Sequence, residues 1–499
     1  MQDWLSARAA ATPDEIAMIV QDKYYSYHSV NGWVYFFGGH FRSIGIKAGT
    51  RVAVLISTNI DFAAVVQTLA AMRVILVPLN IRLTPTEIKW HIEFSKCDVL
   101  LYSEELKSLA SLIDTHIPMH NVDEMVTVDY LVSLDGKLPH GYIAVRVGRK
   151  SPDLSATQAI VFTSGTSGKP KGVEITFGNH FYSAMASAYR LGLNPNDRWL
   201  SVLPLYHVGG LAVIFRSTLY GITTVLHDRF DIDRIQYSFD YHGITMISLV
   251  PTMLYRMIEA GVRWPDSLRL ILLGGAAAPP ELLQRAFDMG LPIAPTYGLT
   301  EAASQVATMR PEDAWKKPGS VGKPLMFTSV RIADENGGSV PAGEYGEVLV
   351  GGPTVMKGYY KNDDANAKTL FNGELRTGDI GYLDEDGDLW LVQRRSDLIV
   401  SGGENVYPAE VENVLRGHPA VREAVVVGVN HPEWGQQVAA AIQLADGATL
   451  TEQELTDYSR EHLAGYKQPR RILFVEAFPQ TASGKIQRGE VSKLFDDTN

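Results

Sequence analysis

Three features are scarce or missing in this chain of 499 residues. Cys97 is the only cysteine, so an internal disulfide is excluded, and we expect a packed thiol rather than a nucleophile. The net charge of -11 gives no basic surface for nucleic acid, so no nucleic-acid partner is expected. The most apolar stretch, residues 62–79, is interrupted by Gln67, Arg73 and Pro78, so no membrane span is expected either.

Other patterns are missing too. The N-terminus has an acid, Asp3, before any apolar core, which argues against a signal peptide and, with the single cysteine, predicts a cytoplasmic protein. We find no internal repeat, no Gly-x-Gly dinucleotide fingerprint and no cluster of metal ligands. What is present is an alternation of apolar strand-like runs, at 52–56, 74–77 and 99–102, with helical stretches such as 61–72. This alternation predicts an α/β fold with helix-covered parallel sheets.

A glycine-rich loop at residues 163–172 follows a short buried strand at 159–162. Its glycines let backbone amides approach an anion, while its hydroxyls and lysines supply donors and positive charge. A P-loop ATPase is the rival interpretation, but only two residues separate Gly165 from Gly168, and Pro170 follows the lysine. The predicted phosphate contacts are Thr163, Ser164, Gly165, Thr166, Ser167, Gly168, Lys169 and Lys171.

This loop resembles the signature of the adenylate-forming superfamily, which includes acyl-CoA synthetases, peptide-synthetase adenylation domains and luciferases. The resemblance covers nearly the whole chain, because the other motifs follow in the same order. It implies a large N-terminal adenylation domain of helix-covered sheets over residues 1–393 and a hinge at 394–397 containing Ser396. A small mobile α+β lid domain would follow over residues 398–499.

The resemblance also implies a site for ATP and Mg²⁺. Adenine would lie against the turn at Gly274, Gly275 and Ala276 and stack on the ring of Tyr297. Thr300 would contact the α-phosphate, and Glu301 would bind the metal, since a carboxylate oxygen suits a hard cation. The remaining nucleotide contacts implied are Thr296, Gly298, Asp379 and Arg394, the last two at the ribose.

A reaction in two halves follows from the same resemblance. An acid and ATP give an acyl-adenylate and pyrophosphate, and then a thiol displaces AMP. The catalytic residues implied are Lys485, Thr300, Glu301 and His207. No carrier domain follows Asn499, so we expect free coenzyme A, with Ser401, Gly402 and Gly403 lining its tunnel.

The acid is indicated by residues 208–227, which hold no Asp or Glu and only one permanent cation, Arg216. The buried ammonium group of an amino-acid substrate would need a carboxylate partner in this segment, so its absence weakens the peptide-synthetase interpretation. His207 would border the acyl pocket. Blocks at 176–183, 203–210 and 394–405 resemble the branch of the superfamily that acts on o-succinylbenzoate in menaquinone biosynthesis, and Arg216 would face the unreacted carboxylate of that acid.

Three alternatives stay open from the sequence. One is a CoA ligase for another aryl or fatty acid, and a second is a luciferase-like oxygenase. The third is an adenylate-binding regulator without catalysis. The expected partners are a small-molecule acid, ATP and CoA, and a homo-oligomer is compatible with the sequence.

Overall fold

The computed structural model describes residues 3–83, 85–125, 153–163, 170–394, 399–401, 404–406, 408–431, 435–463, 465, 467–480 and 486–496. The chain forms two units. The first comprises Met1–Arg331, Leu349–Arg376 and Glu385–Leu389, and the second comprises Ile332–Val348, Thr377–Asp384 and Trp390–Asn499. Most of the predicted hinge falls outside the described residues, so the domain boundary proposed there stays a prediction. None of the described helices is long and apolar enough to cross a membrane.

A seven-stranded sheet carries the N-terminal part of the first unit, in the order β18-β8-β7-β4-β3-β5-β6. The strands from β7 to β6 in that order are mutually parallel, as the alternating pattern predicts, while β8 runs antiparallel to β7. The strand bounds are β3 Arg51–Leu55, β4 Ile75–Pro78, β5 Val99–Tyr102, β6 Met119–Asn121, β7 Thr157–Thr163, β8 Lys171–Thr176 and β18 Gly358–Tyr359. The helices of this region are α1 Trp4–Ala11, α2 Tyr27–Ser43, α3 Ile60–Met72, α4 Pro85–Ser95, α5 Lys107–Ser111, α7 Phe177–Leu191 and α13 Asp363–Thr369.

A second set of strands in the first unit pairs in the order β15-β14-β13-β12-β11-β9-β10-β1-β2. Its centre, from β13 to β1, is parallel. The bounds are β1 Ile16–Val20, β2 Lys23–Ser26, β9 Arg198–Ser201, β10 Thr223–Leu226, β11 Met246–Leu249, β12 Leu270–Leu273, β13 Ile293–Leu299, β14 Ser304–Thr308 and β15 Ser320–Pro324. The carboxyl ends of the parallel strands therefore share one edge, where ligands of α/β sheets usually bind.

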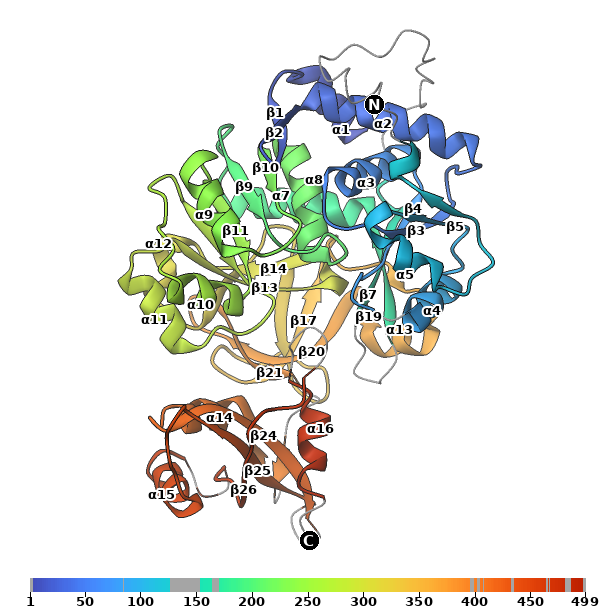
Figure 1. The fold of residues 1–499 in the computed structure, drawn as a ribbon. Coiled ribbons are helices and arrows are strands. Elements are labelled where there is room, and N and C mark those ends of the chain that lie inside the picture. The colour runs from blue at the N-terminus through green and yellow to red at the C-terminus, as the bar shows by residue number, and fades with distance from the viewer. Residues whose placement is uncertain are drawn as a thin grey trace. The chain divides into compact units, whose positions relative to one another are not determined.

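Helices cover both faces of this second sheet (Figure 1). On one face Ile271 and Leu273 pack in a core with α9 (Ile232–Tyr241), α10 (Pro251–Glu259) and α11 (Pro280–Asp288). On the other face Leu270 and Leu272 pack with Val213 of α8 (Val208–Tyr220). A strand buried on both sides reads as an unbroken apolar run, which is why residues 270–273 show no polar alternation.

Helix α3 ends without a glycine. Arg73 is its C-terminal cap, with φ 57° and ψ 40°, and its N–H donates to the carbonyls of Ala70 and Leu69. Local preference favours glycine in a left-handed turn at a helix end, so arginine is unexpected here. The structure shows that the left-handed turn forms with arginine, at a cost of about 1–2 kcal/mol for a residue with a side chain.

Replacing this arginine should therefore stabilise the protein. We expect Arg73→Gly to raise the free energy of unfolding by about 0.5–1 kcal/mol, because the relieved strain exceeds the extra chain entropy of glycine. The measurement is urea denaturation. Arg42→Gly is the matched control, since Arg42 is an exposed residue in the last turn of α2. That control should lose stability by roughly 1 kcal/mol, and a loss of the same size for Arg73→Gly would contradict the argument.

The second unit contains a five-stranded sheet in the order β23-β22-β25-β24, with β26 paired to β25. Helices α14 and α15 lie on one side of it and α16 on the other (Figure 1). Alternate residues of β24 supply the two cores: Ala424 and Val426 face α14, and Val425 and Val427 face α16. The bounds are β22 Ile399–Ser401, β23 Glu404–Val406, α14 Pro408–Arg416, β24 Val421–His431, β25 Gly435–Leu444, α15 Glu452–His462, β26 Arg471–Phe474 and α16 Arg488–Lys493.

Four strands precede this sheet in sequence and are neighbours in the order β16-β17-β20-β21. They span Ser329–Ala333, Gly346–Gly351, Glu374–Leu383 and Leu389–Arg394. The predicted mixed α/β class, with a large first unit and a small α+β unit, agrees with the structure.

Candidate active site

The glycine-rich loop begins and ends on paired strands. Thr163, the last residue of β7, lies opposite Lys171, the first residue of β8, in an antiparallel ladder. Gly172 follows, and a Cβ there would come within 2.9 Å of Ile160 Cγ2, so close packing of the two strands favours glycine. The predicted contacts Ser164, Gly165, Thr166, Ser167, Gly168 and Lys169 lie outside the described residues, and their role in binding phosphate stays a prediction.

The predicted adenine turn follows β12. Gly275 has φ 82°, which favours glycine, and a Cβ on Gly274 would lie 2.6 Å from Thr296 Cγ2. Because β12 and β13 are parallel neighbours, Gly274 at the start of the turn lies beside Thr296. The structure thus brings the predicted small-residue turn to Thr296, the residue that precedes the predicted aromatic residue Tyr297.

Thr296 does not have an uncommitted hydroxyl. Its Oγ1 donates to the carbonyl of Ala307 at 3.0 Å and shares a hydrogen bond of 2.7 Å with Thr308 Oγ1. Both partners lie on β14. We therefore expect Thr296 to contribute backbone and shape to a nucleotide site rather than its hydroxyl.

The predicted metal ligand lies in a strained turn. Thr300 and Glu301 form the 3₁₀ turn η3 (Thr300–Ala302), and the next two residues, Ala303 and Ser304, have φ 51° and 94°. Gly298 is required on the strand before it, because a Cβ there would come within 1.5 Å of the carbonyl oxygen of Ser304. Strain of this kind at consecutive non-glycine residues is typical of functional sites.

Glu301 is partly exposed and held from two sides. Its carbonyl accepts from the N–H of Met356 at 2.8 Å, and its Oε1 accepts from the hydroxyl of Tyr359 at 2.9 Å. One oxygen of the carboxylate is thereby held, and Oε2 has no hydrogen-bond partner among the described residues. A hard, partly exposed carboxylate oxygen fits Mg²⁺.

Tyr359 was missed by the sequence analysis. It lies on β18, 58 residues after Glu301, and Lys171 Nζ stands 4.7 Å from the centre of its ring. Three residues from distant parts of the chain therefore form one group, in which the cation of Lys171 contacts the ring of Tyr359 and the hydroxyl of Tyr359 contacts the carboxylate of Glu301. No local motif signals this, because the strand pairing of β18 with β8 creates it.

His207 immediately precedes α8, after the apolar strand β9. Its side chain is accessible to solvent, while the protein around the ring lowers its pKa by desolvation and Arg82 lowers it further. Tyr206 packs edge-on against the imidazole, with ring centres 4.7 Å apart. His207 is therefore a neutral, accessible ring near neutral pH, which suits the predicted place at the border of an acyl pocket.

Arg216 is a buried cation on α8, with 2% of its surface exposed. Among the described residues no carboxylate pairs with it, its Nε has no hydrogen-bond partner, and burial lowers its pKa. Its Nη2 donates to Ser183 Oγ at 3.1 Å, and Ser183 donates in turn to the carbonyl of Ala303 at 2.7 Å. A buried arginine without an anion is costly unless a ligand supplies the charge.

A neutral histidine sits beside this arginine. Burial and the charge of Arg216 lower the pKa of His180 to about 3, so its ring adds no second positive charge. His180 Nε2 shares a hydrogen bond of 3.1 Å with Gln158 Oε1, and Gln158 Nε2 has no partner among the described residues. Ser183 and His180 fall in the block 176–183, which the sequence analysis noted without assigning roles to its side chains.

The predicted ribose ligand belongs to the second unit. Asp379 lies in β20, not in a loop, and is 8% exposed. Its N–H donates to Thr377 Oγ1 at 3.0 Å, and Thr377 donates to the carbonyl of Val348 at 2.7 Å. These bonds fix the backbone of a Thr-Gly-Asp segment whose role at ribose stays a prediction.

Other predicted residues of the second unit are described only in part. Ser401 is buried at the end of β22, opposite Glu404 and Gly435. Arg394 ends β21, but its side chain lies outside the described residues. The same holds entirely for Ser396, Gly402, Gly403 and Lys485.

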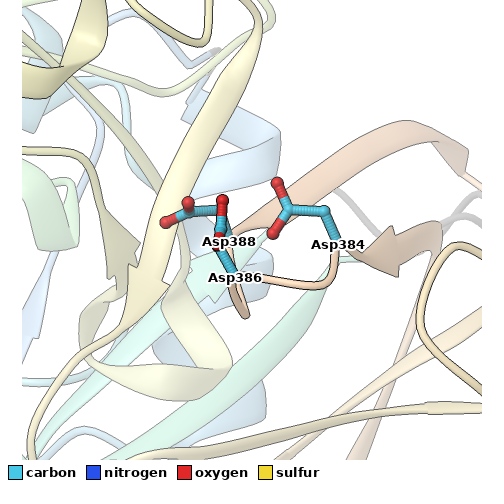
Figure 2. A group of neighbouring side chains, drawn as sticks. All are labelled: Asp384, Asp386 and Asp388. Atoms are coloured by element: carbon cyan, nitrogen blue, oxygen red, sulfur yellow. The ribbon is translucent and has the colours of Figure 1, made fainter.

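One cluster of carboxylates was not expected from the sequence (Figure 2). Asp384, Asp386 and Asp388 lie in the turn between β20 and β21, and their oxygens are within 4.8 Å of one another. Lys317 donates to Asp386 at 2.7 Å and to Asp388 at 2.6 Å, and Trp390 donates to Asp384 at 3.0 Å. The ammonium group of Lys317 thus neutralises part of the negative charge of this turn, so a structural role at the end of a β-hairpin explains the cluster.

Comparison with known proteins identifies the class. Residues 5–360 match the family of AMP-binding enzymes, and residues 410–485 match the AMP-binding enzyme C-terminal domain. The chain therefore belongs to the AMP-binding enzyme family, which confirms the predicted superfamily.

Its relatives include 2-succinylbenzoate–CoA ligases. That of Bacillus licheniformis is 41% identical over 97% of this chain and 98% of its own, and that of Bacillus subtilis is 38% identical over 98% and 97%. The solved o-succinylbenzoate CoA synthetase from Bacillus subtilis in complex with the acyl-adenylate intermediate OSB-AMP has a TM-score of 0.89, at 38% identity over 98% of both chains. The same synthetase with ATP and magnesium ion has a TM-score of 0.88, at 38% identity over 98% of this chain and 99% of that one. The predicted fold class is thereby confirmed.

Proposed function

We propose that this protein is an AMP-forming acid–thiol ligase that joins o-succinylbenzoate to coenzyme A at the expense of ATP. The observation that carries the choice of acid is Arg216, a fully buried cation with no carboxylate partner among the described residues. An acid with two carboxylates supplies the missing anion with one group and reacts through the other. The ligases and synthetase that this chain resembles over nearly its full length carry this substrate in their names.

In the first half-reaction, a carboxylate oxygen of the acid attacks the α-phosphorus of ATP, and the bond to pyrophosphate breaks. This leaves the acyl group as a mixed anhydride with AMP. The protein's part is positioning and charge neutralisation, since the developing charge lies on phosphoryl oxygens. Bound Mg²⁺ would neutralise part of the phosphate charge, with Glu301 as its protein ligand.

Described residues would supply several of these positions. The turn at Gly274, Gly275 and Ala276 would form the side for adenine together with Tyr297, and Thr300, which precedes Glu301, would donate its hydroxyl to the α-phosphate. Lys171 would approach the phosphates from the start of β8. Lys485 would neutralise charge between the α-phosphate and the attacking carboxylate, a role that rests on the family resemblance.

In the second half-reaction, the sulfur of coenzyme A attacks the acyl carbon, the bond to AMP breaks so that AMP leaves with its phosphate oxygen, and the thiol proton passes to solvent. Ser401, Gly402 and Gly403 would line the approach of the pantetheine arm, because residues without bulky side chains let it pass close to the backbone. His207, whose lowered pKa keeps it neutral near pH 7, would border the acyl group and would not compete with Arg216 for the free carboxylate.

The proposal is tested by product analysis with ATP, Mg²⁺ and o-succinylbenzoate. Without CoA we expect pyrophosphate and an enzyme-bound acyl-adenylate, and with CoA one AMP for each thioester formed. A luciferase-like oxygenase would consume oxygen instead, and a non-catalytic relative would release no pyrophosphate. Absence of the thioester under conditions that give pyrophosphate would contradict the proposed second half.

A further inference from the structure

A short segment, residues 356–360, joins the strand that leaves the phosphate loop to the turn that carries Glu301. At one end the N–H of Met356 donates to the carbonyl of Glu301 at 2.8 Å. The next N–H, that of Lys357, donates to the carbonyl of Glu174 at 3.0 Å, and at the other end the N–H of Tyr360 donates to the carbonyl of Gly172 at 2.8 Å. The segment is therefore bonded to both of the loops proposed to hold ATP.

Within this segment the backbone of Tyr359 is fixed on both sides. Its N–H donates to Asn366 Oδ1 at 2.6 Å, and Asn366 Nδ2 donates back to its carbonyl at 3.0 Å. It also pairs with Val173 across the β18–β8 ladder. The side chain is 6% exposed. The backbone that carries the phenol is thus held by side-chain and strand hydrogen bonds on both sides.

The phenol is aimed at the proposed metal ligand. Its hydroxyl donates to Glu301 Oε1 at 2.9 Å, while Lys171 Nζ lies 4.7 Å from the ring centre. A hydrogen bond to a carboxylate is stronger than one between neutral groups, and a cation over the ring draws electron density from the phenol. The bond fixes the rotation of the carboxylate and leaves Oε2 for another partner.

We propose that Tyr359 is a positioning residue for Mg²⁺-ATP: it orients Glu301 so that the free carboxylate oxygen meets the metal, and it couples that orientation to Lys171. This rests on the proposed role of Glu301 in the reaction above. The competing explanation is that Tyr359 only fills space and that its hydroxyl takes the nearest acceptor. The two explanations differ in what removal of the hydroxyl does to the metal dependence of ATP binding.

The experiment measures ATP binding by calorimetry across a range of Mg²⁺ concentrations, with neither acid nor CoA present. For Tyr359→Phe we expect the Mg²⁺ concentration that half-maximally strengthens ATP binding to rise by about three- to tenfold, with binding of metal-free ATP unchanged. The control is Tyr27→Phe. Tyr27 is also buried and donates its hydroxyl to the carbonyls of Ser217 and Ile222, so loss of this hydroxyl should lower the melting temperature without changing the Mg²⁺ dependence.

A double-mutant cycle tests the route through Glu301. In a Glu301→Gln background, Tyr359→Phe should change the Mg²⁺ dependence by less than about twofold, because the group it orients is already neutral. If Tyr359→Phe proves unstable, Asn366→Ser loosens the same backbone without touching the phenol and should shift the Mg²⁺ dependence in the same direction.

Three results would overturn the proposal. They are an unchanged Mg²⁺ dependence in Tyr359→Phe, a shift of the same size in the Glu301→Gln background, and ATP binding by the unmodified protein that is indifferent to Mg²⁺. Because no acid is present, these results can be read even if the protein forms no thioester from o-succinylbenzoate. A failure of the proposed substrate is therefore separate from a failure of this inference.

Discussion

Lys485→Ala is expected to abolish acyl-adenylate formation almost completely while leaving thioester formation from supplied acyl-adenylate. The lysine is proposed to neutralise charge between the α-phosphate and the attacking carboxylate, an interaction that exists only in the first half-reaction. Loss of one group that stabilises developing charge typically costs about 10²- to 10³-fold in rate, so pyrophosphate release should fall by at least about 100-fold. The measurements are pyrophosphate release with o-succinylbenzoate and thioester release from synthetic acyl-adenylate with CoA.

The matched control is another lysine of the second unit. Lys493 pairs with Glu490 at 2.7 Å on α16 and is exposed, so Lys493→Ala should leave both half-reactions within about twofold of the unmodified protein. If Lys485→Ala slowed both half-reactions to the same extent, the lysine would not be specific to adenylation, and the proposed division of labour would be wrong.

Arg216→Ala is expected to lower kcat/KM for o-succinylbenzoate by at least about tenfold. Truncation leaves the free carboxylate of the acid buried without a partner, which typically costs about 2 to 5 kcal/mol, and each 1.4 kcal/mol is about tenfold. Arg216→Lys should recover part of the loss, because it restores the charge without the planar geometry of the guanidinium. A monocarboxylic aryl acid of similar size should lose little with either variant.

A hydrogen bond from Arg216 to Ser183 makes Ser183→Ala the control for this experiment. Arg216 also donates to Ser183, which donates to the carbonyl of Ala303 beside Glu301, so truncation can disturb the turn as well as the acid. Ser183→Ala removes that connection and leaves the cation. It should lower kcat/KM for both acids alike. An equal loss with both acids in Arg216→Ala would mean that the arginine supports the fold and does not recognise the substrate.

Much of the fold follows from local patterns. The apolar runs at 52–56, 74–77 and 99–102 correspond to β3, β4 and β5, and the helical stretch 61–72 is α3, because period and length decide these assignments within one segment. The end of α3 could not be decided that way. Arg73 adopts a left-handed conformation because the following strand β4 and the hydrogen bonds to Leu69 and Ala70 outweigh the local preference against it.

In the candidate site, too, features set by one continuous segment could be proposed from the sequence, whereas features set by contacts between distant segments could not. The phosphate loop, the adenine turn and the segment ending in Glu301 could be proposed from the sequence, because each is continuous and carries its own glycines, hydroxyls or charge, and their roles stay predictions. Tyr359 could not, since strand pairing brings it to Glu301 across 58 residues. Asp379 shows a smaller difference. A Thr-Gly-Asp triplet reads as a turn, yet the residue lies within β20, where Thr377 fixes its backbone.

For Arg216, the charge pattern of the sequence and the burial in the structure are both needed for the interpretation. The sequence shows a lone cation in an uncharged segment, which favours an anionic substrate but does not exclude an exposed arginine. The structure removes the exposed alternative, because only 2% of the residue is accessible, and shows a serine as its described hydrogen-bond partner. Burial with no counter-charge in the part of the chain that the structure describes is the physical reason to expect a dicarboxylic acid.

The most direct test of the proposed function is ATP-dependent CoA-thioester formation by the unmodified protein across a panel of acids. The panel contains o-succinylbenzoate, its analogue in which the second carboxylate is replaced by an amide, benzoate and a medium-chain fatty acid. We predict that o-succinylbenzoate gives the highest kcat/KM and exceeds the amide analogue by at least about tenfold, the value of one desolvated charge pair. Equal or better turnover of the amide analogue or of a monocarboxylic acid would contradict the account.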